Sequence, residues 1–207
     1  MSTPPQLLAI DGPAGPIECA IDAPTGAARG VAVIAHPLPT QGGTMDNKVV
    51  HTVARAARAC GLTAVRFNFR GVGSSSGAWD EGRGEVDDLM AVIHQFRQPG
   101  RPFVLAGFSF GGFVATQACA RLGEAGRPDQ LVLVGPAAGR FQVAEVPAGT
   151  LVVHGEADDV VPLQAVLDWA RPQTLPVTVV PGVGHFFHGQ LTLLKDLVQR
   201  HLRAALG

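Results

Sequence analysis

The sequence predicts one domain of the α/β class, with a mostly parallel sheet and helices on both of its faces. Short apolar runs typical of buried strands alternate with longer segments of helical periodicity, and Gly or Pro marks most of the boundaries. That alternation is typical of βαβ units around a parallel sheet. No repeat, low-complexity tract or change of composition divides the 207 residues, so residues 1–207 are expected to form a single domain.

Local signals predict the elements in chain order. An opening hairpin is expected at residues 6–11 and 17–23, because the Gly12-Pro13-Ala14-Gly15-Pro16 segment between them is rich in turn residues. Apolar runs predict further strands at 31–36, 62–69, 103–108, 131–135, 151–154 and 177–180. Helical periodicity predicts helices at 48–60, 85–96, 111–122, 163–170 and 187–206. Asp46 or Asn47 would cap the first helix, and Gly61 would end it.

Charge and composition exclude several classes of function. The formal net charge is -1 and no basic stripe is present, so a nucleic-acid partner is not expected. The cysteines, Cys19, Cys60 and Cys119, are odd in number and form no CxxC, which indicates a reducing compartment. Residues 1–10 lack a secretory pattern, and apolar runs of about six residues are too short to span a membrane. We therefore expect a cytoplasmic protein without a membrane partner.

The segment Gly107-Phe108-Ser109-Phe110-Gly111 is a G-x-S-x-G pentapeptide between a predicted strand and a predicted helix. Such a sharp strand-to-helix turn, a nucleophile elbow, exposes a serine hydroxyl. The alternative is an accidental glycine turn, but the composition predicts only about 0.08 accidental matches in the chain. Ser109 is thus the candidate nucleophile.

A serine hydroxyl is a weak nucleophile at neutral pH and needs an adjacent base, which a carboxylate orients. In the expected chain order the acid and then the histidine follow the serine. Asp158 follows the strand at 151–154, and His185 follows the strand at 177–180. Because ligands bind at the carboxyl ends of parallel strands, Ser109, Asp158 and His185 are expected to meet at one edge of the sheet as a catalytic triad.

Four other residues compete for these roles. Asp159 adjoins the predicted acid, and Glu145 is a more remote alternative. His188, one helical turn after the predicted base if the last helix starts at 187, would be a surface or gate residue. His154 ends a strand and is expected to pack beneath the acid loop.

An oxyanion hole needs two backbone N–H groups. One is expected from Phe110, which follows the nucleophile. The other is expected from the loop after residues 31–36, where Pro37 and Pro39 have no N–H, so that Leu38 is the first donor past His36. The alternative is a rigid loop with no catalytic task.

Two further features have structural interpretations. Residues 71–77 resemble a dinucleotide-binding loop but are one residue too long and lack a phosphate-loop lysine, so a solvated turn is expected. Arg66, Asn68 and Arg70 alternate along a strand and are expected to support the loops at the active-site edge.

These motifs together resemble the small, lidless bacterial α/β-hydrolases related to dienelactone hydrolases and carboxylesterases. The resemblance spans residues 17–207 and is carried by His36-Pro37, Gly42-Gly43-Thr44-Met45-Asp46-Asn47-Lys48, Arg66-Phe67-Asn68-Phe69-Arg70-Gly71, the Ser109 pentapeptide and the Asp158 and His185 segments. It implies an α/β-hydrolase fold with an eight-stranded sheet, and activity on carboxylic esters without metal or organic cofactor. Dienelactone hydrolases use Cys where Ser109 stands, which argues against a dienelactone substrate.

The leading hypothesis is a serine hydrolase that cleaves small-molecule esters through an acyl-enzyme. A thioesterase or peptidase with the same triad, and a catalytically silent binding protein, are the alternatives. Residues 136–149 are too short for a cap domain, so the pocket is expected to be open, with Phe108, Phe110, Leu38 and Phe186 or Phe187 as an acyl-binding wall.

Overall fold

The computed structural model describes residues 4–207, which form eight strands and five α-helices. The strands are β1 (Gln6–Ile10), β2 (Ile17–Asp22), β3 (Gly30–Ala35), β4 (Leu62–Phe67), β5 (Phe103–Phe108), β6 (Gln130–Val134), β7 (Leu151–Gly155) and β8 (Val177–Val180). The helices are α1 (Lys48–Ala59), α2 (Arg83–Phe96), α3 (Phe110–Gly126), α4 (Leu163–Ala170) and α5 (Leu191–Leu206), with 3₁₀ turns at Pro39–Gln41 and Arg171–Gln173. Every predicted strand and helix is present, within a few residues of its predicted bounds.

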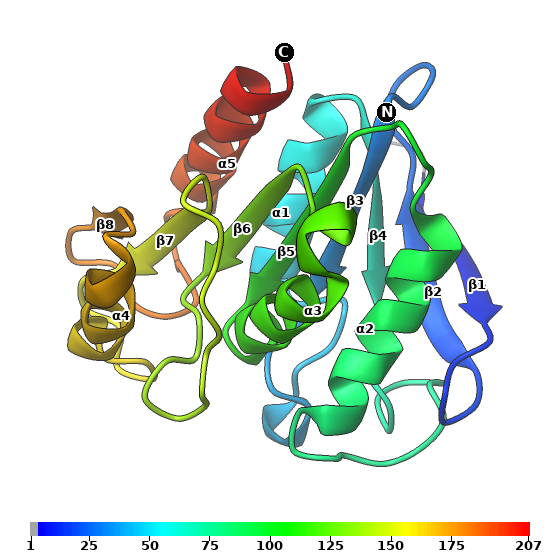
Figure 1. Ribbon diagram of the computed structural model, residues 1–207, viewed down its shortest axis with the longest axis horizontal. Coiled ribbons are helices and arrows are strands. Elements are labelled where there is room, and N and C mark those ends of the chain that lie inside the picture. Colours follow the sequence, from blue (N-terminus) through cyan, green and yellow to red (C-terminus); the bar gives the residue numbers. More distant parts are fainter. Residues whose placement is uncertain (1–3) are drawn as a thin grey trace.

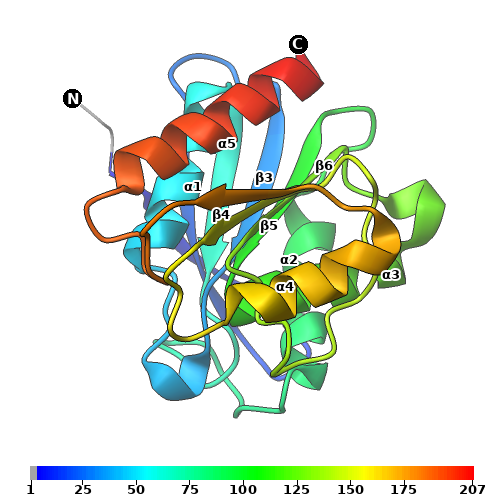
Figure 2. The ribbon, with the colours of Figure 1, turned by 90° about the vertical axis from the view of Figure 1, so that its left-hand side faces the viewer.

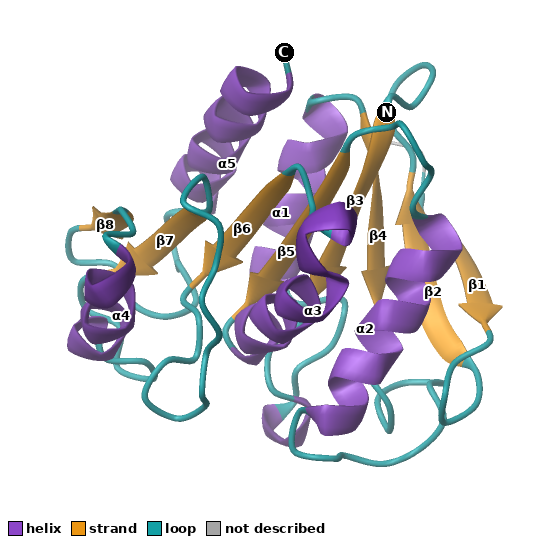
Figure 3. Ribbon diagram, viewed as in Figure 1, coloured by secondary structure: helices purple, strands orange, loops and turns teal. Residues whose placement is uncertain are grey.

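All eight strands form one sheet in the order β1-β2-β4-β3-β5-β6-β7-β8 (Figure 1). The pairs β1–β2 and β2–β4 are antiparallel, and the remaining pairs from β4 to β8 are parallel. The predicted mostly parallel, eight-stranded sheet is therefore confirmed. The parallel strands point to the same edge, where the loops that follow β3, β5, β7 and β8 gather (Figure 3).

Helices cover both faces of the sheet. Figure 2 shows α1 and α5 on one side and α2, α3 and α4 on the other. The two faces have separate cores because side chains alternate along each strand: Val104 and Ala106 of β5 pack toward α1 and α5, whereas Phe103 and Leu105 pack toward α2 and α3. Strands buried on both faces explain why the sequence shows continuous apolar runs.

Helix α1 begins at a side-chain cap. The Asn47 side chain accepts a hydrogen bond from the Val49 N–H at 2.8 Å, so Asn47, and not Asp46, is the N-cap. Gly61, with φ of +78°, directly follows the C-cap residue Cys60, as the sequence predicts.

The last helix begins at Leu191 and not at residue 187. Residues 181–190 instead form a series of turns, in which Gly182, Phe187 and Gly189 have positive φ. A helical residue has negative φ, so the apolar pattern of this segment belongs to a loop that buries Val183 and Phe187 against α1 and α5.

No helix of the described chain lies between Gly135 and Leu151, and residues 136–149 run as an irregular segment. The expected absence of a cap domain is confirmed, because α4 and α5 follow later strands and this segment has no element of its own that could form one. Among residues 4–207, no helix is long and apolar enough to cross a membrane.

Candidate active site

Ser109 lies at a strained turn between β5 and α3. Its backbone has φ of 56° and ψ of −118°, a region that non-glycine residues rarely adopt and that costs about 1–3 kcal/mol. The two glycines of the pentapeptide permit the turn: a Cβ on Gly107 would lie 2.1 Å from the Gly111 carbonyl oxygen, and a Cβ on Gly111 would lie 2.3 Å from the Ala35 carbonyl oxygen. The predicted strand–turn–helix context of Ser109 is therefore present.

The structure brings the three predicted residues together in one line of hydrogen bonds. The Ser109 Oγ lies 3.0 Å from His185 Nε2, and His185 Nδ1 lies 2.7 Å from Asp158 Oδ2. When Nδ1–H donates to the carboxylate, Nε2 is left as the acceptor for the serine hydroxyl. The relative exposures of Ser109, Asp158 and His185 are 7%, 7% and 3%, so the line lies just beneath the surface.

Asp158 is held by the turn after β7. Its Oδ1 accepts hydrogen bonds from the backbone N–H groups of Val160 at 2.9 Å and Val161 at 2.7 Å, which leaves Oδ2 for His185. Burial raises the pKa of Asp158, but the hydrogen bonds from His185 and from the two N–H groups outweigh that effect and hold its pKa below the ordinary value. Asp158 is therefore ionised at neutral pH.

The competing residues lie elsewhere or play other parts. Asp159 and Glu145 are exposed, and neither is the partner of His185. His188 is also exposed and stacks on Phe186, with ring centroids 5.8 Å apart, in a loop and not one helical turn after the predicted base.

His154 packs beneath the acid loop, as the sequence predicts. It is fully buried, and its Nε2 lies 2.9 Å from the Val161 carbonyl oxygen and 3.5 Å from Asp158 Oδ2. Burial lowers the pKa of His154, more than the nearby carboxylate raises it. A neutral His154 whose Nε2–H donates to Val161 therefore supports the turn that presents Asp158.

The sequence predicts that the backbone N–H groups of Phe110 and Leu38 form an oxyanion hole. Phe110 is the first residue of α3, and the first N–H groups of a helix have no intrahelical acceptor. The Leu38 N–H donates to no acceptor within residues 4–207, while its carbonyl accepts from the Gln41 and Gly43 N–H groups. Neither N–H group therefore has a hydrogen-bond acceptor among residues 4–207, as an oxyanion donor requires.

His36 orients the Leu38 donor, a role that the sequence does not reveal. Its Nδ1–H donates to the Pro37 carbonyl oxygen at 2.6 Å, and its Nε2 accepts from the Phe69 N–H at 3.1 Å. The Pro37 carbonyl and the Leu38 N–H belong to one planar peptide group and point in opposite directions. By holding the carbonyl, His36 therefore fixes the direction of the Leu38 N–H.

The buried His36 makes the stability of the fold dependent on pH. Burial lowers its pKa from 6.5 to about 4, so His36 stays neutral when the folded chain is acidified. The unfolded chain then binds the extra proton, and we expect the free energy of unfolding to fall by about 3 kcal/mol between pH 6.5 and pH 4 from this residue. His36→Asn should flatten this pH dependence in denaturant titrations.

The matched control for this prediction is His94→Gln, which replaces an exposed histidine of α2. This variant should keep the wild-type pH dependence of unfolding. An equal slope in wild type and His36→Asn would contradict the assignment of a buried, neutral His36.

A cavity of about 120 Å³ adjoins Ser109. It is lined by Pro37, Leu38, Gln41, Gly42, Gly43, Asn47, Ser109, Val160, His185 and Phe186. Leu38 and Phe186 of the predicted acyl-binding wall line this cavity. Phe108, Phe110 and Phe187 do not line it, because all three side chains are buried in the two cores of the sheet. Within residues 4–207 no group of three or more His, Cys, Asp or Glu side chains could hold a metal ion.

Comparison with known proteins places this geometry in a family. Residues 26–141, more than half of the chain, match the family described as serine aminopeptidase, S33. An α/β serine hydrolase without lid from Xanthomonas campestris is 42% identical, with a TM-score of 0.87 over 99% of this chain and 96% of that one. An α/β serine hydrolase homologue from Coxiella burnetii is 39% identical, with a TM-score of 0.82 over 95% and 97%.

A further relative is an uncharacterized protein of Rickettsia prowazekii, which is 29% identical over 199 residues, 88% of this chain and 82% of that protein. The sequence match includes the Ser109 pentapeptide, and the structural matches extend over the Asp158 and His185 segments. The chain therefore belongs to the serine aminopeptidase S33 family and is a lidless α/β serine hydrolase.

Proposed function

We propose that this chain hydrolyses carboxylic esters through an acyl-enzyme, with Ser109, His185 and Asp158 as its catalytic triad. The observation that carries the proposal is the unbroken pair of hydrogen bonds from Ser109 through His185 to Asp158. The Ser109 Oγ attacks the ester carbonyl carbon while its proton passes to His185 Nε2. His185 then returns that proton to the leaving alcohol, and Asp158 stabilises the imidazolium formed between the two steps.

The carbonyl oxygen becomes an oxyanion during the attack, and in this proposal the N–H groups of Phe110 and Leu38 bind it. Preorganised donors of this kind are each worth about a hundredfold to a thousandfold in kcat. Water then attacks the acyl-enzyme by the same steps, with His185 as the base, and releases the carboxylic acid and free Ser109.

The cavity favours esters over the free amino termini that an aminopeptidase binds. A charged amino group is bound most strongly by a carboxylate, and none of the residues that line the cavity, all within the described chain, is Asp or Glu. Asp159 does not line this cavity and lies instead in the lining of a neighbouring hollow. We expect kcat/KM for p-nitrophenyl acetate to exceed that for aminoacyl p-nitroanilides by at least about a hundredfold.

A panel of ester, thioester and aminoacyl amide substrates tests this assignment. Ser109→Ala serves as the background, because p-nitrophenyl esters also react slowly with other nucleophiles. Faster turnover of the amides than of the esters would overturn the ester assignment and favour a peptidase.

Acyl-chain length gives a second test. The cavity of about 120 Å³ has room for a short chain only, and no cap covers the rest. Each buried CH₂ contributes roughly 0.8 kcal/mol, about fourfold, whereas one left in water contributes nothing. We expect kcat/KM on p-nitrophenyl esters to peak at short chains, roughly acetate to butyrate, without activation on micelles. A steady rise out to long chains would show that a loop closes over the site.

A further inference from the structure

Arg66 and Asn68 hold one residue of the loop that follows β3. Arg66 Nη1 donates to the Met45 carbonyl oxygen at 2.9 Å, and Asn68 Oδ1 accepts from the Met45 N–H at 2.8 Å. Asn68 directly follows β4, and its N–H still donates to the Glu18 carbonyl oxygen at 2.9 Å, so the side chains of Arg66 and Asn68, two positions apart, lie on the same side and reach the same residue. Both side chains are buried, as is Met45, so water does not compete for these bonds.

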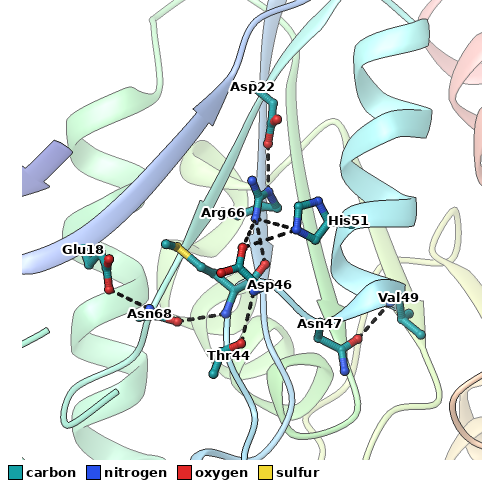
Figure 4. Close-up of polar contacts among 10 residues, drawn as sticks. Glu18, Asp22, Thr44, Asp46, Asn47, Val49, His51, Arg66 and Asn68 are labelled. Carbon is teal, nitrogen blue, oxygen red and sulfur yellow. Dashed lines mark hydrogen bonds and ion pairs between the residues drawn. The ribbon is translucent and has the colours of Figure 1, made fainter. Parts of the chain in front are cut away.

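The same two side chains are anchored on the neighbouring strand, β2. Arg66 Nε donates to Asp22 Oδ2 at 2.8 Å, and Asn68 Nδ2 donates to Glu18 Oε2 at 2.8 Å (Figure 4). Two parallel chains of hydrogen bonds therefore run from carboxylates of β2, through Arg66 of β4 and Asn68 just after it, to the backbone of Met45.

Further contacts hold each of these two chains of hydrogen bonds in place. Arg66 Nη1 also contacts Asp46 Oδ1 at 3.0 Å and His51 Nε2 at 3.2 Å, which places its buried charge among polar partners. Glu18 Oε2 accepts a second hydrogen bond from the Ser74 N–H at 3.0 Å. The segment at 71–77 is thus partly tied to β2 and is not the purely solvated turn that the sequence predicts, since Ser75 is also buried.

Met45 belongs to the stretch that forms one wall of the cavity beside Ser109. Its neighbours Gly42, Gly43 and Asn47 line that cavity, and the Gly43 N–H donates to the Leu38 carbonyl at 3.0 Å. A shift of Met45 is therefore passed directly to the wall and to Leu38, which supplies the proposed oxyanion donor.

We propose that Arg66 and Asn68 are positioning residues that hold the 38–47 loop at the distance from Ser109 that oxyanion binding requires. This role rests on the proposed ester hydrolysis. A misplacement of about 1 Å outside the reacting groups can cost on the order of a hundredfold in rate. Since the loop's donor acts in the transition state, its displacement lowers kcat and leaves KM nearly unchanged.

Swapping the hydrogen-bond donor and acceptor between Asn68 and Glu18 gives the sharpest test. In Asn68→Asp the new carboxylate still accepts from the Met45 N–H but loses the donor to Glu18 and faces a second carboxylate. We expect kcat on p-nitrophenyl acetate to fall about tenfold to a hundredfold. In the double variant Glu18→Gln with Asn68→Asp, the glutamine NH₂ donates to the new carboxylate but no longer accepts from the Ser74 N–H, so the rescue is partial, and kcat should rise at least about threefold above that of Asn68→Asp.

Asp88→Asn is the matched control. Asp88 accepts three hydrogen bonds from Arg70, which lies three residues after the end of β4, is as buried as Asn68, and forms no hydrogen bond with the 38–47 loop. It should lose stability but keep the wild-type kcat when assayed below its unfolding midpoint. Should Asn68→Asp fail to fold, Arg66→Lys replaces it, because the single Nζ of Lys cannot occupy the positions of both Nε and Nη1, which donate to Asp22 and Met45.

Hydrogen exchange of the 38–47 amides provides a readout that does not need activity. Faster exchange in Asn68→Asp, partly reversed in the double variant, is the expected result. Unchanged exchange and kcat in Asn68→Asp, or an equal loss of kcat in Asp88→Asn, would overturn the positioning role. If the wild-type chain has no esterase activity but hydrogen exchange in the variants changes as expected, the proposed function is refuted. The role of Asn68 in holding the loop then still stands.

Discussion

Ser109→Ala is expected to lower kcat for ester hydrolysis by about a millionfold while the chain stays folded. Loss of a triad nucleophile has an effect of this size because the acyl-enzyme can no longer form. The substitution removes one oxygen, whose hydrogen-bond partner in the structure is His185, and it leaves the backbone of the turn as it is. Circular dichroism and the thermal midpoint should therefore match the wild type.

Ser76→Ala is the matched control, since Ser76 is a half-buried serine of the 71–77 segment, outside the cavity that adjoins Ser109. It should hydrolyse p-nitrophenyl acetate at the wild-type rate after the same purification. If pure Ser109→Ala keeps most of its activity, another group is the nucleophile and the triad assignment is wrong.

Asp158→Asn is expected to lower kcat by about ten-thousandfold, whereas Asp159→Asn should change it by less than about threefold. The two N–H groups of Val160 and Val161 donate to Oδ1, so an asparagine would place its oxygen there and turn its NH₂ toward His185. His185 Nδ1 would then accept, and its Nε2 would carry the proton. In that tautomer Nε2 cannot take the Ser109 proton.

The steady-state kinetics of both aspartate variants, with thermal midpoints measured in parallel, decide between the two residues. Asp159 is exposed, so its substitution should leave the thermal midpoint nearly unchanged. If Asp159→Asn is the more damaging change, Asp159 is the acid and the hydrogen bond from His185 to Asp158 is only structural.

Much of the fold and the position of the candidate site could be predicted from the sequence. The buried strands gave apolar runs, and the pentapeptide around Ser109 requires glycines at two positions where any Cβ would collide with backbone oxygens. Asp158 could not be separated from Asp159 in this way. Their sequence neighbours are nearly the same, and only the turn decides which carboxylate faces His185.

Other features depend on contacts between residues far apart in the chain. The role of His36 requires the Phe69 N–H, 33 residues later, to fix its ring. Of the predicted wall, Leu38 and Phe186 line the cavity, but Phe108 and Phe110 do not, because proximity to Ser109 in the sequence does not tell which face of the sheet or helix a ring occupies. Arg66 and Asn68 were expected to support the loops at this edge, and the structure shows that they hold Met45.

Whether Ser109 is an activated nucleophile is decided by the intact mass of the chain after reaction with a fluorophosphonate. We expect one adduct per chain, mapped by peptide sequencing to Ser109, with ester hydrolysis lost in proportion to labelling. Ser109→Ala should gain no adduct under the same conditions. A folded wild-type chain that stays unlabelled, or an adduct on another residue while hydrolysis continues, would show that Ser109 is not the nucleophile.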